Sequence, residues 1–270
     1  PLVEAGAHFA RFGTRRSTRY LIRNHQKMAI ADDARMLIGG FNVEDGYFGI
    51  PADDCWADLG LWIEGEQVGA MARWYGQLWR WVGTKKQRFR TLRRMVRQWD
   101  PSLRHDPSGP FRWLIGGPTQ RLSPRAAQRN GARIILPARS DNGATIAAAR
   151  LLYGPLLKRG VDIAEYQRCK LHTKLLVIDD AVFIGSANFD MRSLFLNLEV
   201  MLRIEDTGFA AAVRGMIDRH AEESQAISLE TIRANRTLPM LVKQWISYLL
   251  VGVLDYTVTR RLNFRDPNAD

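Results

Sequence analysis

Two short segments of the chain carry the same arrangement of histidine, lysine and aspartate. The first, HQKMAIAD, runs from His25 to Asp32, and the second, HTKLLVID, runs from His172 to Asp179. Each is a His-x-Lys-x-x-x-x-Asp motif, and each is followed by a glycine and then by an asparagine. A chance match is expected on the order of 0.01 times in a chain of this composition. Two matches therefore indicate one site built from both copies.

The histidine and the lysine of each copy are spaced to act on the same group. Side chains two positions apart on an extended strand project from the same face, so His25 points with Lys27, and His172 with Lys174. The residue between them points to the other face. Two copies that face each other across a pseudo-twofold axis would place two imidazoles and two ammonium groups around one small volume. That volume suits a phosphate.

The same four side chains meet the needs of phosphodiester cleavage. The reaction requires a nucleophile, an acid for the leaving group, and positive charge near the phosphate oxygens. A neutral imidazole can attack phosphorus to give a covalent phosphohistidine. The opposite imidazolium can protonate the departing alcohol and then deprotonate the incoming one. Because the lysines would hold the non-bridging oxygens, we expect neither a metal ion nor another cofactor.

The remaining polar residues of the motifs are further candidates. Asp32 and Asp179 belong to the candidate catalytic set, and we expect them to tie the turn together, because their odd spacing from the lysine places them on the other strand face. Asn42, Ser186 and Asn188 can donate hydrogen bonds to a phosphate. An ordinary glycine turn is the alternative interpretation of each of these three.

Short strands are expected to carry both motifs. Residues 26–31 and 36–41 read as two strands joined by a turn, and residues 175–178 and 181–186 repeat the pattern. The second copy has one residue fewer between its aspartate and its glycine. We expect this deletion to change the strand register and to tilt Ser186 and Asn188. Farther along, RIILP, a helix from Gly143 to Gly160 and VDIAEYQ predict a parallel βαβ unit.

A basic, aromatic segment separates the two motifs. Residues 73–97 contain nine Lys or Arg residues and no acidic residue, with tryptophan and tyrosine among them. We predict a helical insert at about residues 70–99. It is either a solvated helix that packs its tryptophans inward or a docking face for lipid headgroups or nucleic acid.

Composition sets broad limits on the protein. The 270 residues carry a formal net charge of +11, which favours nucleic acid, anionic lipid or phosphorylated substrates as partners. The two cysteines, Cys55 and Cys169, predict no disulfide framework and a reducing compartment. The apolar stretch from Trp245 to Leu254 is too short to span a bilayer. It is either a buried helix or a helix that lies on a membrane surface.

The doubled motif resembles the hallmark of the phospholipase D superfamily. A narrower resemblance is to bacterial cardiolipin synthases and their relatives. It covers roughly residues 1–65 and 110–265 and rests on RNHQKMAIAD, IGGFNV, CWADLGLWIEG, RIILPARSDN, HTKLLVID, IGSANFDMRSLFLNLEV and LDYTVTRRLNF. The resemblance implies an α/β fold, a two-lobed α/β/α sandwich with pseudo-twofold symmetry and one motif per lobe. We place the lobes at residues 1–109 and 110–270.

The resemblance also implies roles for individual residues. It implies that His25 is the nucleophile and His172 the acid/base, and that a carboxylate orients each of them. Asp58 and Glu199 occupy matching places in the two halves, and we expect crosswise pairing, Glu199 with His25 and Asp58 with His172. Two surface carboxylates are the alternative. Because only residues 118–132 fill a gap where the family has a strand and a helix, we expect elements to be missing there and at the N-terminus.

The leading functional expectation is phosphatidyl transfer by a covalent phosphohistidine, with cardiolipin synthesis from phosphatidylglycerol as the reaction. The expected partner is an anionic membrane that contains phosphatidylglycerol and cardiolipin, bound peripherally on the cytoplasmic side of a bacterial membrane, and no obligate protein partner is expected. One alternative is a nuclease or another phosphodiesterase with the same chemistry. Another is an inactive relative that binds membranes or polyanions.

Overall fold

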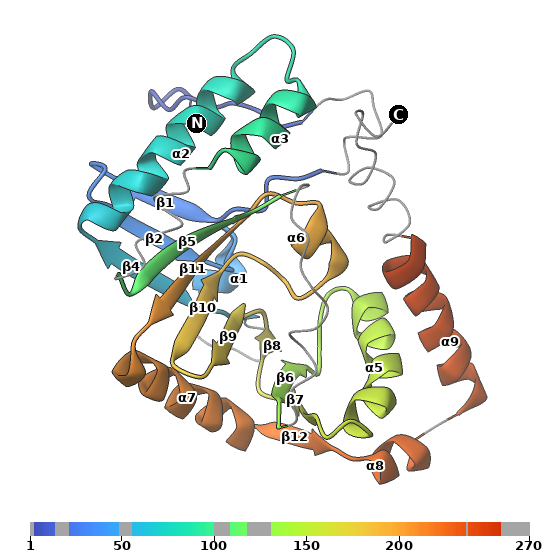
Figure 1. The fold of residues 1–270 in the computed structure, drawn as a ribbon. Coiled ribbons are helices and arrows are strands. Elements are labelled where there is room, and N and C mark those ends of the chain that lie inside the picture. Colours follow the sequence, from blue (N-terminus) through green and yellow to red (C-terminus); the bar gives the residue numbers. More distant parts are fainter. Residues whose placement is uncertain are drawn as a thin grey trace, which may run out of the picture.

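The two motifs lie in two separate antiparallel sheets. The computed structural model describes residues 3–13, 22–48, 56–99, 109–117, 131–235 and 237–254. The first sheet has the strand order β1-β2-β4 and the second the order β5-β11-β10-β9. Their strands are β1 (Met28–Ala31), β2 (Arg35–Gly39), β4 (Gly60–Glu64), β5 (Phe111–Gly116), β9 (Leu175–Ile178), β10 (Ala181–Gly185) and β11 (Glu199–Glu205). Figure 1 shows the second sheet in the middle of the molecule and the first sheet beside it, next to α2.

The expected register change between the two motif hairpins does not occur. In β1–β2, Met28 pairs with Ile38 and the turn spans three residues, whereas in β9–β10, Leu175 pairs with Ile184 and the turn spans two. In both hairpins the paired isoleucine is followed by the motif glycine. The missing residue is therefore absorbed by the turn, where aspartates adopt left-handed backbone angles, with φ of 54° at Asp32 and 50° at Asp179.

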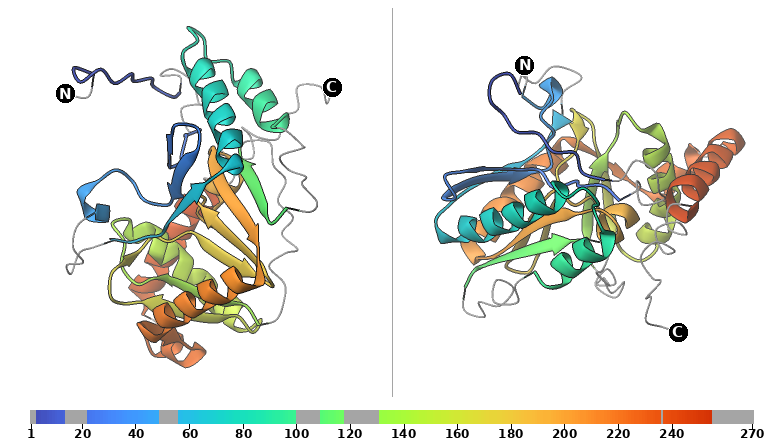
Figure 2. Two further views of the ribbon diagram at one scale, coloured as in Figure 1. Left: turned by 90° about the vertical axis from the view of Figure 1, so that its left-hand side faces the viewer. Right: turned by 90° about the horizontal axis from the view of Figure 1, so that it is seen from above.

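One hydrophobic core joins the motif sheets to a helical hairpin. The basic segment forms two helices, α2 (Glu66–Val82) and α3 (Phe89–Arg97), which lie side by side at one end of the molecule (Figures 1 and 2). Their buried side chains include Trp74, Leu78 and Trp81, which pack in the same cluster as residues of β2, β5, β10 and β11. Inward packing of tryptophan is therefore confirmed for Trp74 and Trp81. Because this core draws on both sides of residue 109, the division into lobes there stays a prediction.

The predicted parallel βαβ unit is present beside the second motif sheet. It consists of β6 (Arg133–Pro137), α5 (Gly143–Leu157) and β7 (Asp162–Tyr166), and β6 pairs with β7 in parallel. The strand β12 (Ser224–Ile227) extends this sheet on the other edge of β7. The remaining elements are α1 (Asp45–Phe48), β3 (Trp56–Ala57), β8 (Lys170–Leu171), α6 (Met191–Phe195), α7 (Thr207–Glu222) and α8 (Leu229–Ala234).

The apolar C-terminal stretch is not a buried helix. It forms the end of α9 (Leu238–Tyr248) and a π-helical segment, η3 (Leu249–Leu254). Trp245 and Ile246 are each 53% exposed, so the buried interpretation is wrong. One face of α9 packs on α5, and the other carries apolar side chains outward. Within the described part of the chain, no helix has both the length and the apolar character to cross a membrane.

Two sequence expectations involve residues outside the described regions, namely Cys55 and residues 118–130. Cys169 is disulfide-bonded, although the sequence predicted no disulfide framework, and the reducing compartment stays a prediction. The other cysteine of the sequence, Cys55, lies outside the described residues. Most of the segment expected to lack a strand and a helix, residues 118–130, also lies outside them.

Candidate active site

Parallel backbone bridges bring each motif histidine to the opposite half of the molecule. The residue before His25 forms a parallel bridge to Leu198, and the residue before His172 pairs in parallel with Ala57. The amide N–H of His25 donates to the carbonyl oxygen of Leu198 at 2.9 Å, and that of His172 to the carbonyl oxygen of Ala57 at 2.8 Å. Each bridge partner is followed by a carboxylate. The backbone therefore builds two equivalent histidine–carboxylate contacts across the halves.

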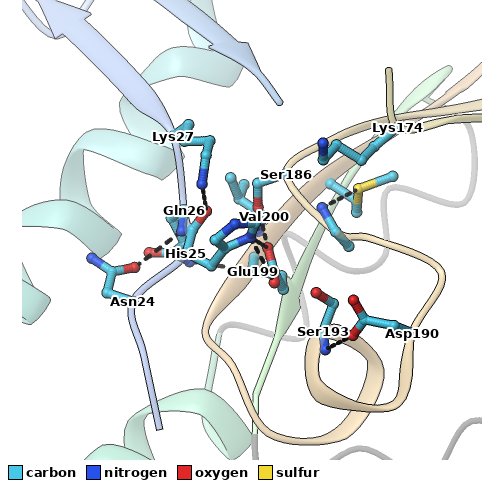
Figure 3. Close-up of polar contacts among 12 residues, drawn as sticks. Asn24, His25, Gln26, Lys27, Lys174, Ser186, Asp190, Ser193, Glu199 and Val200 are labelled. Carbon is cyan, nitrogen blue, oxygen red and sulfur yellow. Dashed lines mark hydrogen bonds and ion pairs between the residues drawn. The ribbon is translucent and has the colours of Figure 1, made fainter. Parts of the chain in front are cut away.

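Glu199 holds the ring of His25. The Nδ1 atom of His25 lies 3.0 Å from both carboxylate oxygens of Glu199, which is 1% exposed at the start of β11. Oε2 of Glu199 also accepts a 2.6 Å hydrogen bond from the hydroxyl of Ser186, which in turn accepts from the amide of Val200. Figure 3 shows His25 meeting Glu199, with Lys27 and Lys174 on either side of the pair. The ring orientation leaves Nε2 of His25 free for a reacting group.

Asp58 holds the ring of His172 in the same way. The Nδ1 atom of His172 lies 2.6 Å from Oδ2 of Asp58, and Oδ1 accepts from the amide of Leu59 at 2.8 Å. The crosswise contacts expected from the sequence are therefore both present. The roles of the two carboxylates in a reaction stay a prediction.

Two aromatic rings, those of Tyr47 and Trp56, form an aromatic wall beside His172. The described contacts of His25 include no such rings. Tyr47 of α1 and Trp56 of β3 stack on each other with ring centroids 5.3 Å apart. Both meet the imidazole of His172 edge to face, at 5.5 and 5.2 Å. The hydroxyl oxygen of Tyr47 lies 3.3 Å from Nδ1 of His172. Sequence reasoning missed this pair, because an isolated tyrosine or tryptophan near a motif usually packs in the core.

Glycine and serine occupy equivalent positions in the two copies, with different consequences. Ser186 follows the glycine of the second motif and contacts Glu199, as described above. Its counterpart in the first copy is Gly40. A Cβ atom there would lie 2.6 Å from Cδ of Lys174 and 2.7 Å from Oδ1 of Asp58. The absent side chain at Gly40 thus provides the space in which Lys174 approaches Asp58.

The two lysines lie in partly dehydrated surroundings. Nζ of Lys27 donates to the carbonyl oxygen of His25 at 3.1 Å, and Nζ of Lys174 donates to that of His172. Lys174 is 7% exposed, and burial lowers its pKa to about 7 despite the opposing charge of Asp58. Burial also lowers the pKa of Lys27. Both ammonium groups are therefore placed where an anion would stabilise them.

The charge of a lysine in one motif copy affects the pKa of the histidine in the other. Burial lowers the pKa of His172, the hydrogen bond to Asp58 opposes this effect, and the charges of Lys174 and Lys27 add to the lowering. Lys27 belongs to the first copy and His172 to the second. A negative phosphate between the lysines would remove their influence and raise the pKa of His172.

The other sequence candidates differ in their exposure and in their position on the motif hairpins. Asp32 and Asp179 are exposed in the hairpin turns, at the far ends of β1 and β9, where Asp32 pairs with Arg35 at 2.6 Å. Asn42 and Asn188 follow the ends of β2 and β10, Asn42 exposed and Asn188 half-buried. Ser186 is fully buried against Glu199, so its hydroxyl orients a carboxylate. Contact of any of them with phosphate stays a prediction.

Gln26 connects the site to α2, a contact that the motif alone did not reveal. Its side-chain oxygen accepts from the indole N–H of Trp74 at 3.2 Å, and its amide nitrogen donates to the backbone oxygen of Glu199 at 3.2 Å. Gln26 thus points away from the lysine face, as strand alternation requires. Among the described residues, no cluster of three or more histidine, cysteine or carboxylate side chains could hold a metal ion.

Residues 120–221 match the family model described as cardiolipin synthase, PLD-like domain. Two curated relatives extend the similarity over most of the chain. Cardiolipin synthase A of Pseudomonas entomophila is 29% identical over 285 residues, which cover 89% of this chain and 57% of the relative. Minor cardiolipin synthase ClsB of Bacillus subtilis is 30% identical over 254 residues, covering 84% and 63%. Most of the chain is therefore similar to cardiolipin synthases, and residues 120–221 resemble a PLD-like domain.

The similarity to a solved structure concerns the fold of this phospholipase D-like chain. The crystal structure of phosphatidylserine synthase from Haemophilus influenzae Rd KW20 matches 91% of this chain and 71% of its own, with a TM-score of 0.56 and 12% identity. The expected mixed α/β fold class is therefore confirmed. The chain spans just over half the length of the curated relatives described above.

Proposed function

We propose that this chain transfers a phosphatidyl group between two phosphatidylglycerol molecules and so forms cardiolipin. The observation that carries the proposal is the crosswise pair of histidine–carboxylate contacts, at 3.0 Å for His25 with Glu199 and 2.6 Å for His172 with Asp58. Each contact occupies Nδ1 and leaves Nε2 for chemistry. Similarity to cardiolipin synthases supports phosphatidylglycerol as the substrate.

In the first step, Nε2 of His25 attacks the phosphorus of phosphatidylglycerol. Glu199 accepts the hydrogen of Nδ1 and so favours the tautomer with a lone pair on Nε2. The bond from phosphorus to the glycerol oxygen breaks, and Nε2 of His172 supplies the proton that the leaving oxygen needs. The product is a phosphatidyl-histidine and free glycerol.

In the second step, the terminal hydroxyl of another phosphatidylglycerol attacks the phosphatidyl-histidine. His172, now neutral, takes the hydroxyl proton, and the phosphorus–nitrogen bond to His25 breaks. Lys27 and Lys174 hold the non-bridging oxygens in both steps, and Asn42 and Asn188 donate further hydrogen bonds. Water in place of the second lipid gives phosphatidic acid instead.

The role of His172 as an acid depends on the bound phosphate. In the free protein, burial and both lysines lower the pKa of His172, which favours its neutral form. A bound phosphodiester neutralises part of the lysine charge and so restores the protonated imidazole. Asp58 then stabilises the imidazolium.

The direct test is incubation of the chain with phosphatidylglycerol vesicles and, separately, with single-stranded DNA. We expect cardiolipin and glycerol in equal amounts, detected by mass spectrometry, and unchanged activity in EDTA because no step uses a divalent ion. A His25→Ala variant is the control for contaminating activity. DNA cleavage without a lipid product would contradict the proposal in favour of a nuclease. Vesicle binding without product in either assay would contradict it in favour of an inactive binding protein.

By this proposal the chain acts at the surface of a bacterial membrane, on its cytoplasmic side. The substrate is then a lipid headgroup presented by the bilayer. The excess of basic over acidic residues, a formal net charge of +11, supports attraction to such an anionic surface.

A further inference from the structure

The outer surface of the α2–α3 hairpin, residues 66–97, carries a large excess of positive charge, and Glu66 at its start is its one acidic residue. No acidic residue occurs from Gln67 to Trp99. The exposed cations on α2, on its connection to α3 and on the first turn of α3 include Arg73, Arg80, Lys85, Lys86, Arg88 and Arg90. Within the described residues, the structure pairs none of these six with a carboxylate. The hairpin therefore presents a cationic surface to solvent.

Two aromatic side chains lie on the solvent-exposed side of α2. Tyr75 is 45% exposed and Trp79 is 37% exposed, and their rings stack with centroids 6.0 Å apart. They are four positions apart, so they lie on one face of the helix. Half-buried tyrosine and tryptophan beside basic residues is the composition of helices that lie in a lipid headgroup layer.

The inner side of the same helix contacts the candidate active site. The indole of Trp74 donates to Gln26, which is adjacent to His25 and donates to the backbone of Glu199. An α-helix with its side chains is about 10–12 Å across. A surface bound to the outer face of α2 is therefore roughly one helix diameter from the residues that position His25.

We propose that the α2–α3 hairpin docks the protein on an anionic lipid bilayer, with its cations among the headgroup phosphates and Tyr75 and Trp79 at the headgroup level. Charge complementarity identifies an anionic partner. The choice of a bilayer over nucleic acid rests on the proposed function, and it is supported by the aromatic pair, whose rings stack on each other instead of standing apart to receive bases.

A second exposed surface offers a competing site for the same partner. On α9 and η3, Leu238, Val242, Trp245 and Leu249 form an exposed apolar row on one helix face. The helix α9 lies on a different side of the molecule from the α2–α3 hairpin, as Figures 1 and 2 show. Membrane binding through α9 would need apolar insertion and would depend little on lipid charge. The two surfaces can therefore be separated by experiment.

The decisive experiment measures binding to vesicles by co-sedimentation. The hairpin variant carries Lys85→Gln, Lys86→Gln, Arg88→Gln and Arg90→Gln. A matched control removes the same number of exposed cations elsewhere, with Lys158→Gln, Arg159→Gln, Arg219→Gln and Arg233→Gln. On vesicles of equal phosphatidylglycerol and phosphatidylcholine, we expect the hairpin variant to bind on the order of tenfold or more weakly than the parent. The control should stay within about twofold, because its cations lie far from the bilayer.

A second variant tests the aromatic pair without changing the charge. Tyr75→Ser combined with Trp79→Ser should weaken vesicle binding several-fold, whereas Trp245→Ser combined with Ile246→Ser on α9 should leave it unchanged. Parent binding should also disappear on vesicles of phosphatidylcholine alone and decline steeply with added salt. Thermal unfolding of each variant checks that the fold is retained.

Three outcomes would overturn the docking proposal: equal losses for the hairpin variant and its remote control, loss of binding only in the α9 variant, or single-stranded DNA that displaces the protein from vesicles at equal phosphate concentration. Activity on monomeric short-chain phosphatidylglycerol separates this proposal from the enzymatic one, because that substrate needs the active site and no bilayer. The hairpin variant should retain parent activity there. Lack of activity in every variant, with hairpin-dependent binding intact, would contradict the proposed function alone.

Discussion

The two halves of the candidate site have the same backbone arrangement around each histidine but different side chains. Around His25, a carboxylate and a buried serine form a polar chain of hydrogen bonds. Around His172, a shorter carboxylate contact is combined with Tyr47 and Trp56, and Lys174 packs against Gly40, which has no side chain. A duplicated scaffold thus supports two unequal histidines. Two unequal roles, nucleophile and acid/base, are what a two-step transfer requires.

Removing each histidine in turn should have the largest effect. We expect His25→Ala to lower turnover on the order of 10⁴-fold or more and to abolish the acid-labile phosphoenzyme, because no group replaces its Nε2. We expect His172→Ala to lower turnover comparably on phosphatidylglycerol but to retain phosphoenzyme formation when the leaving group is an acidic phenol. Rapid quenching with a labelled substrate measures both. The reverse result, with phosphoenzyme lost only in the His172 variant, would exchange the two roles.

The orienting carboxylates should rank next. Glu199→Gln and Asp58→Asn keep the size of each side chain and remove its charge, so each should lower turnover about 10²–10⁴-fold. Because Glu199 is proposed to act through His25, its variant should slow phosphoenzyme formation. Because Asp58 is proposed to act through His172, its variant should spare phosphoenzyme formation when an acidic phenol is the leaving group. If both variants slow phosphoenzyme formation equally with the phenol substrate, the two histidines do not have separate roles.

The residues at the equivalent positions 40 and 186 can be exchanged, so that each motif copy carries the residue of the other. Gly40→Ser makes the first copy resemble the second, but its Cβ would overlap Lys174 and Asp58, at 2.6 and 2.7 Å. We expect turnover to decrease about 10²-fold, since even small displacements of catalytic groups are strongly felt. Ser186→Gly should decrease it only about tenfold, because Glu199 keeps its contact with His25. If the two variants lower turnover equally, the close packing of Lys174 and Asp58 against Gly40 is not required for activity.

Lys174 should make anion binding depend on pH. Its pKa is about 7 in the free protein, so it loses its proton as the pH rises through 7, and the affinity for a soluble phosphodiester such as glycerophosphoglycerol should decrease by up to about tenfold per pH unit above that value. Calorimetry should detect proton uptake on binding near pH 8. Lys174→Met should abolish this dependence, and Lys27→Met should retain it. An affinity independent of pH in the parent would contradict the assignment.

The same group affects folding stability with a defined sign. The pKa of Lys174 is lowered from 10.5 in the unfolded chain to about 7 in the folded one, so the unfolded state binds more protons between these values. The contribution of Lys174 to stability therefore rises with pH across this window. Thermal unfolding of Lys174→Met should show a flatter dependence on pH than the parent.

The sequence predicted those parts of the molecule that depend on local pattern. The strands at residues 28–31 and 175–178 and the parallel βαβ unit follow from alternation and spacing, whereas the crosswise contacts of Glu199 and Asp58 were expected from the resemblance. Parallel bridging before each histidine is the long-range feature that turns this pattern into a site. Each bridge joins the residue before a motif histidine to the residue before a carboxylate. The histidine–carboxylate pairing could therefore be anticipated from the resemblance.

The features that were missed depend on three-dimensional packing. The register survived the shorter turn because aspartates such as Asp179 accept left-handed angles, which a residue count does not reveal. The wall of Tyr47 and Trp56 forms only when α1 and β3 meet beside His172. The exposure of α9 likewise depends on which of its faces reaches α5, and an apolar run alone does not specify that.

The aromatic wall should give the smallest effect. The hydrogen on Nδ1 of His172 goes to Asp58 at 2.6 Å, which leaves the hydroxyl of Tyr47, 3.3 Å away, with a weak interaction at most. Burial and the charge of Asp58 raise the pKa of Tyr47 to about 12, so the hydroxyl stays neutral. Tyr47→Phe keeps the ring and should change turnover less than about fivefold. Tyr47→Ala removes the stack on Trp56 and should lower turnover more, with a shift in the pH profile of His172. Equal losses in the two variants would mean that the hydroxyl, and not the ring, supports the histidine.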